Sequence, residues 1–138
     1  MPLLTRLYIK CSLFYLGAAL VIDIGRAFPV PGQLASFFSR LRPVYFHLFL
    51  VGWVTLFIIG VANWLFPWAS REQFNHHPLL AWSAFGLLNL GLILRTFLEP
   101  TAGGSHRLVS WLLVLSGLTQ WVGGLLVIFQ LGPRLKKR

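Results

Sequence analysis

The sequence contains few charged residues and very few acids. Charged side chains make up 11% of its 138 residues, whereas soluble domains average about 25%. The only acids are Asp23, Glu72 and Glu99. The apolar runs therefore contain no paired carboxylates, and a proton-coupled transporter, which needs buried acids at depth, has no support. With 57% hydrophobic residues, this composition is typical of a membrane protein.

The sequence contains a single cysteine, Cys11. One thiol excludes an internal disulfide, a CxxC metal site and a covalent CxxCH haem attachment. We also find no Ser/His/Asp or Cys/His arrangement and no phosphate-binding loop. Hydrolytic and phosphoryl-transfer chemistry is therefore not indicated.

Basic residues are present in excess, with twelve lysines and arginines against three acids. The resulting formal charge of +9 could indicate nucleic-acid binding. However, the bases lie at the ends of apolar runs, where topology signals and lipid head-group anchors are found. We therefore expect the partner of this charge to be a lipid bilayer and not a nucleic acid.

Four apolar runs are long enough to approach or exceed the roughly 20 residues that cross a bilayer. They cover about 7–28, 43–67, 79–95 and 106–131. Short loops between them predict an all-α integral membrane protein, a four-helix up-down-up-down bundle forming one domain over 1–138. Four spans put both termini on one side, which receives seven of the twelve bases. The positive-inside rule therefore predicts cytoplasmic termini.

Several positions predict how the spans end and pack. Asn89 lies near the middle of the third span, so we expect it to hydrogen-bond another helix. The spacing of Asp23 and Arg26 allows an interfacial ion pair, with a proton or cofactor contact at Asp23 as the alternative. Gly132-Pro133 is expected to end the fourth helix.

Small and polar residues form a stripe along the fourth span. We expect this stripe to approach a neighbouring helix, a cofactor or a second copy of the chain. Its members are His106, Ser110, Leu113, Gly117, Gln120 and Gly124, with Gly123 beside them.

Two histidines fall at the outer ends of parallel spans, His47 in the second and His106 in the fourth. Two imidazoles facing each other would fill both axial positions of a b-type haem. Arg42, Arg95 and Arg107 are assigned to the same side, where guanidinium groups could bind the haem propionates. These five residues are the predicted cofactor site, with His47 and His106 as the iron ligands.

Other interpretations of the histidines stay open. A histidine near a helix start often only hydrogen-bonds a backbone carbonyl or a lipid head group, and this applies to both His47 and His106. His76 and His77 lie in a loop and are expected to be solvated, because Glu72 is the only carboxylate or thiolate near enough in sequence to help bind a metal.

The segment from His47 to Pro67 resembles the second transmembrane helix of the catalytic subunits of haem-copper oxidases and nitric oxide reductases. That helix carries a low-spin haem ligand near its outer end. It closes with a Gly-rich, aromatic and proline motif, here Gly60-Val-Ala-Asn63-Trp64-Leu-Phe-Pro67. The resemblance implies that His47 binds haem, and it assigns nothing to His106. Four spans lack the later helices of that subunit, so one copy cannot form a complete oxygen-reducing site.

The chain also looks like small four-helix bacterial relatives of that subunit. This resemblance implies a b-type haem protein of the bacterial inner membrane, acting in electron transfer or in binding oxygen or nitric oxide. A homo-oligomer and a respiratory-chain redox partner are expected with it. The alternative is a cofactor-free accessory or assembly subunit of a respiratory complex. A transporter or channel fragment is the third possibility, resting on Asn89 and Gln120.

Overall fold

The computed structural model describes residues 2–28, 32–66, 78–102 and 107–135. These residues are almost entirely helical, and no strand occurs among them, so the predicted all-α class is confirmed. The elements in chain order are α1 (Leu3–Ala27), α2 (Gln33–Arg40), α3 (Arg42–His47), the π-helical segment η1 (Leu48–Thr55), α4 (Leu56–Leu65), α6 (Pro78–Leu98), the 3₁₀ turn η2 (Glu99–Thr101) and α7 (Arg107–Leu135).

Among the described residues, four helical segments are long and apolar enough to cross a membrane, as the sequence predicted. They cover Leu3–Ala27, Gln33–Leu65, Leu79–Thr101 and Arg107–Arg134. The helices extend beyond most of the apolar runs because long basic side chains at their ends can reach toward a polar interface without breaking the helix. The direction in which each span crosses a bilayer stays a prediction.

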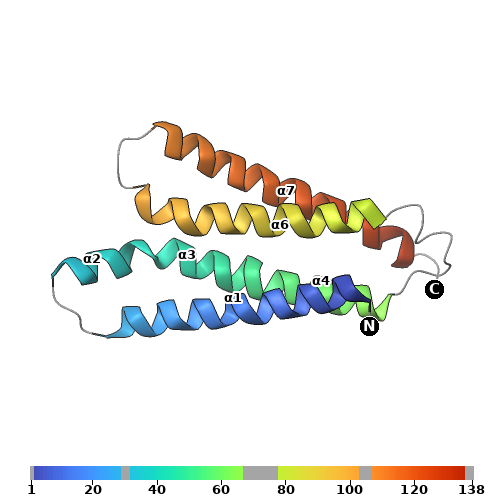
Figure 1. Ribbon diagram of the computed structural model, residues 1–138, viewed down its shortest axis with the longest axis horizontal. Coiled ribbons are helices and arrows are strands. Elements are labelled where there is room, and N and C mark those ends of the chain that lie inside the picture. The colour runs from blue at the N-terminus through green and yellow to red at the C-terminus, as the bar shows by residue number, and fades with distance from the viewer. Residues whose placement is uncertain (1, 29–31, 67–77, 103–106, 136–138) are drawn as a thin grey trace.

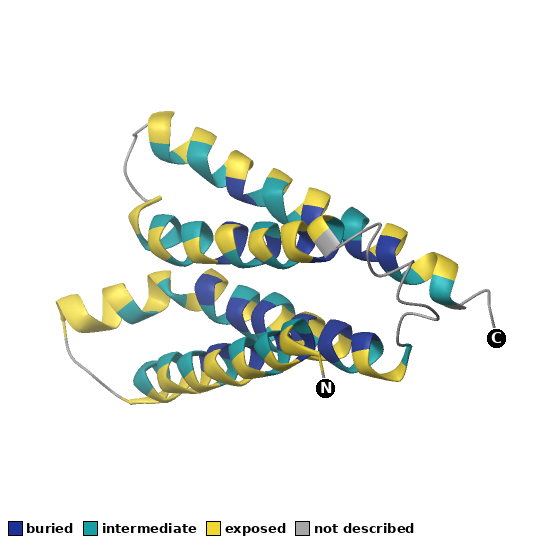
Figure 2. Cartoon of the chain, turned by 45° about the vertical axis from the view of Figure 1, so that its right-hand side comes forward, coloured by how far each residue is buried: buried dark blue, intermediate teal, exposed yellow. Residues whose placement is uncertain are grey.

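The helices form two packed pairs (Figure 1). One pair is α1 with the second span, which combines α3, η1 and α4, and the other is α6 with α7. The pairs meet mainly through α6, which contacts η1 and α3, while α4 touches α7. Figure 2 shows buried residues on the inward faces and exposed ones on the outer faces. The exposed side chains include many large apolar ones, such as Phe14, Leu79, Trp111 and Phe129, as expected for a surface in contact with lipid.

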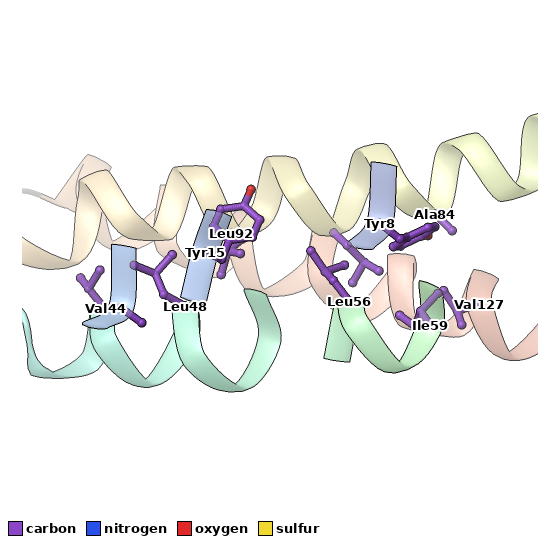
Figure 3. Close-up of a cluster of buried hydrophobic side chains, with 11 residues drawn as sticks. Tyr8, Tyr15, Val44, Leu48, Leu56, Ile59, Ala84, Leu92 and Val127 are labelled. Atoms are coloured by element: carbon purple, nitrogen blue, oxygen red, sulfur yellow. The ribbon is translucent and has the colours of Figure 1, made fainter. Parts of the chain in front are cut away.

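The interior is filled by apolar side chains from all four spans (Figure 3). Tyr8, Leu56 and Leu92 are completely buried, and Val127 of α7 completes the cluster at one end. The ring of Tyr8 meets that of Phe85 edge-on, with centroids 4.8 Å apart, which joins α1 to α6. This core fixes which ends of α3 and α6 lie together.

Close packing of α6 against α7 depends on small residues. A Cβ added to Gly91 would lie 2.8 Å from the backbone oxygen of Ser116, and the Ser116 hydroxyl donates to the Gly91 carbonyl at 2.8 Å. A Cβ added to Gly123 would likewise lie too close to Leu88 of α6. Backbones this close are typical of membrane helix pairs that contain small residues at the interface.

The packing face of α7 is turned from the predicted one. The buried positions are Ser116, Gly123, Val127 and Gln130, not the stripe that includes Gly117 and Gly124. A Cβ on Gly124 would meet nothing within 4 Å, and one on Gly117 would meet only an Arg95 nitrogen at 3.9 Å. Gln120 was assigned correctly, since its side chain lies against Gly91. Two stripes of small residues lie side by side on this helix, and within one protomer α6 packs against the second. An approach of Gly117 and Gly124 to a cofactor or to a second copy stays a prediction.

The fourth helix also continues past its predicted stop, with Pro133 inside its last turn. A proline this near a helix end removes one hydrogen bond and has little helix left to disturb. Arg134 holds this last turn, because its Nη1 donates to Asn63 Oδ1 at 3.0 Å and to the Phe66 carbonyl at 3.2 Å.

Asn89 has the partner on another helix that the sequence predicted. The Tyr15 hydroxyl donates to Asn89 Oδ1 at 2.8 Å, while Asn89 Nδ2 donates to the Phe85 carbonyl at 2.8 Å. This bond links α1 to α6 within the apolar interior, where an unpaired amide would cost several kcal/mol.

Replacing Tyr15 with phenylalanine should lower the free energy of unfolding by about 0.6–2 kcal/mol, the range for a hydrogen bond between membrane helices. Denaturation in mixed detergent micelles, followed by circular dichroism, measures the change. Tyr45→Phe is the matched control, since the Tyr45 hydroxyl bonds to none of the described residues. Equal losses in the two variants would contradict the assigned role of Tyr15.

Candidate functional site

The candidate site is built around His47, the last residue of α3. Nδ1 of its ring lies 2.8 Å from the carbonyl oxygen of Pro43 and 3.4 Å from Glu99 Oε1. A carbonyl and a carboxylate oxygen only accept hydrogen bonds, so Nδ1 must carry the proton. In the neutral ring, Nε2 is then the nitrogen with a free electron pair. Nε2 makes no contact of this kind with the part of the chain that the structure describes.

A π-helical segment begins directly after His47. Its hydrogen bonds span five residues, and the Thr55 hydroxyl also reaches back five residues to the Leu50 carbonyl at 2.8 Å. Between Val44 and Leu56 every fourth residue is buried, namely Val44, Leu48, Gly52 and Leu56.

The wider turn explains this regular burial. In an α-helix, steps of four residues rotate the side chain by about 40° each, so the four positions would leave the interior. The π-helical turns keep them facing inward and allow Gly52 to approach α1, where its Cβ would lie 2.8 Å from that of Tyr15. Such segments are frequent at functional sites. The sequence gives no signal for this segment, because nearly all residues of the run are apolar and the buried positions are known only from the structure.

Glu99 joins His47 to the third span. Its Oε1 accepts a hydrogen bond from Arg95 Nε at 2.7 Å and faces His47 Nδ1. The Glu99 side chain is only 9% exposed, whereas Asp23, the other acid that the structure describes, is 53% exposed. Glu99 Oε2 is buried and has no hydrogen-bond partner among residues 2–28, 32–66, 78–102 and 107–135. We call His47, Arg95 and Glu99 the outer cluster, since they lie at the end of the bundle assigned to the outer side.

The structure brings together some of the predicted site residues and not others. His47 and Arg95 meet through Glu99. Arg42 and Arg107 are exposed at the starts of α3 and α7, and neither is paired with a described residue. His106 lies outside the described residues, as do His76 and His77, so their predicted roles stay predictions.

Glu99 was missed as a site residue. Glu99 lies beyond the predicted end of the third span, and the predicted site contained only histidines and arginines. The available signal was the spacing of Arg95 and Glu99, four residues apart at the end of a helix, which places both on one face. The contact with His47 had no sequence signal, since it joins positions on different spans.

The ion pair predicted at the end of the first span is present. Arg26 Nη1 lies 3.7 Å from Asp23 Oδ1, and the Arg26 guanidinium lies 5.8 Å from the centre of the Tyr45 ring. This pair is half-exposed, which fits an interfacial salt bridge.

A second polar cluster closes the opposite end of the bundle. Asn63 Oδ1 accepts hydrogen bonds from Gln130 Nε2 and from Arg134 Nη1, both at 3.0 Å. Asn63 and Gln130 are buried. These bonds tie α4 to α7 and give Asn63, part of the motif after His47, a structural role.

No group of three or more histidine, cysteine, aspartate or glutamate side chains gathers within the described ranges. A site that holds a bare metal ion through several protein ligands is therefore not supported by these residues. A haem differs, because its macrocycle supplies four ligands and the protein supplies one or two.

No known protein family, curated protein or solved structure matches this chain. The likeness of the second span to an oxidase helix therefore depends only on the residues quoted above. The evidence for function comes from the outer cluster itself.

Proposed function

We propose that this membrane protein binds b-type haem through Nε2 of His47. The observation that carries the proposal is the engagement of Nδ1 by the Pro43 carbonyl and Glu99. Metal-binding histidines almost always donate their other ring N–H to a carbonyl or a carboxylate, which fixes the tautomer and the ring orientation. A histidine that only hydrogen-bonds a backbone carbonyl, and binds no haem, would make the same contact with Pro43. An absorption spectrum distinguishes these two roles of His47.

The remaining residues fit the group in part. Arg95 supplies a guanidinium next to His47, although Glu99 already occupies its Nε. Arg42 and Arg107, exposed at the starts of α3 and α7, are the candidates for binding propionates. When bound, the haem would supply one-electron transfer with both axial positions filled, or binding of oxygen or nitric oxide with one position open.

In this proposal His106, from the same protomer or from a second copy, would be the second residue to hold the haem. A homo-oligomer, suggested by the small residues Gly117 and Gly124 on the fourth span, is part of this proposal. Placement in the bacterial inner membrane, with cytoplasmic termini and a respiratory-chain redox partner, belongs to the same proposal.

A cofactor-free subunit of a respiratory complex is the second candidate. It is favoured by the outer face of α7, which exposes many large apolar side chains that could contact larger subunits as well as lipid. They include Leu108, Trp111, Leu118, Trp121, Ile128 and Phe129.

Absorption spectroscopy distinguishes the two candidates. Protein purified after expression with ample haem should show a Soret band and, on reduction, the narrow bands of a six-coordinate b-type haem. Binding of carbon monoxide by the reduced protein would instead indicate one open axial position. Colourless protein that co-purifies with larger membrane subunits would favour the cofactor-free alternative and overturn the haem proposal.

A further inference from the structure

We propose that Glu99 and Arg95 set the reduction potential of the haem bound at His47, in opposite directions. Glu99 acts as a positioning residue, through the His47 ring and not on the iron. This inference rests on the proposed function and deepens it, because it names the residues that regulate the site.

The geometry makes Glu99 a bridge between two groups. One oxygen, Oε1, lies 2.7 Å from Arg95 Nε and 3.4 Å from His47 Nδ1. A histidine that only needed a hydrogen-bond acceptor already has one in the Pro43 carbonyl at 2.8 Å. The carboxylate therefore adds charge at the ring more than it adds a hydrogen bond.

Burial makes this charge effective. The Glu99 side chain is 9% exposed, and water screens charges less where it is excluded. Its second oxygen, Oε2, is buried without a hydrogen-bond partner among the described residues, so Arg95 compensates only part of the carboxylate. Leaving a carboxylate oxygen buried in this way is costly.

The signs of the two effects follow from charge. A carboxylate beside Nδ1–H raises the basicity of the ligand nitrogen and favours the oxidised, more positive iron, so it lowers the reduction potential. The Arg95 guanidinium favours the reduced state and raises the potential. A structural role alone would not give effects of opposite sign.

The test is a redox titration of the haem-loaded protein, followed by its absorption. Glu99→Gln should raise the equilibrium constant for reduction about tenfold, which is about 59 mV for one electron. Arg95→Gln should lower it by a similar factor. Glu99→Asp keeps the charge and should stay near the wild-type potential, which separates charge from damage to the fold.

Asp23→Asn is the matched control. It also removes one negative charge from this end of the bundle, but Asp23 is 53% exposed and paired with Arg26. We expect a shift less than a third of that in Glu99→Gln. Shifts of the same sign in Glu99→Gln and Arg95→Gln, or equal shifts in Glu99→Gln and Asp23→Asn, would overturn the inference.

A second measurement does not need the haem. In haem-free protein with ¹⁵N-labelled histidine, Glu99→Gln should move the Nδ1 resonance of His47, assigned by its loss in His47→Ala, and Asp23→Asn should leave it in place. An unmoved resonance in Glu99→Gln would overturn the inference even in a haem-binding protein. A wild-type protein without haem would overturn the proposed function, and with it the effect on potential.

Discussion

Replacing His47 with alanine should abolish the haem absorption of the purified protein. The substitution removes the nitrogen proposed to bind the iron, together with the ring that Pro43 and Glu99 hold in place. Losing only an outer partner of a metal ligand costs about 10–100-fold in affinity, so loss of the ligand itself should cost about 100-fold or more. The measurement is the ratio of Soret absorbance to protein absorbance, together with a haem titration of the apoprotein.

Two variants serve as controls for this loss. His76→Ala removes a histidine that the sequence places in a loop, and it should leave the Soret band unchanged. His106→Ala should preserve haem binding but convert a six-coordinate spectrum to a five-coordinate one. A normal Soret band in folded His47→Ala protein would show that the site has been assigned to the wrong residue.

The largest effect on stability should come from Gly91→Ala. The new methyl group would lie 2.6 Å from Thr119 Oγ1 and 2.8 Å from the backbone oxygen of Ser116. A serine rotamer cannot relieve a clash with backbone, so α6 and α7 must move apart and strain the bond from Ser116 to the Gly91 carbonyl. Overpacking of this kind costs about 1–3 kcal/mol. Detergent-induced unfolding, followed by circular dichroism, measures the loss.

Gly86→Ala is the matched control on the same helix. A Cβ at Gly86 meets nothing within 4 Å, and alanine favours a helix over glycine by about 1 kcal/mol. This variant should therefore be neutral or slightly stabilised. If Gly86→Ala and Gly91→Ala changed stability equally, the close contact between α6 and α7 would not be the reason.

The sequence by itself determined the class of the protein and its four spans. Apolar runs of membrane length with charges at their ends have one common solution, the helix, since lipid cannot satisfy an open backbone. Single polar residues in such runs also had to find partners, so the bond of Asn89 to another helix was predictable. The ion pair of Asp23 and Arg26 followed from local spacing alone.

Only the tertiary structure decided which faces meet and what surrounds His47. Helix α7 has two stripes of similarly small residues, one with Gly117 and Gly124 and one with Ser116 and Gly123. Only the second stripe packs against α6. The sequence predicted histidines and arginines at the same depth as the partners of His47. The structure instead brought Glu99 to its ring, because packing of α3 against α6 joins residues 52 positions apart, a distance that local sequence patterns do not record.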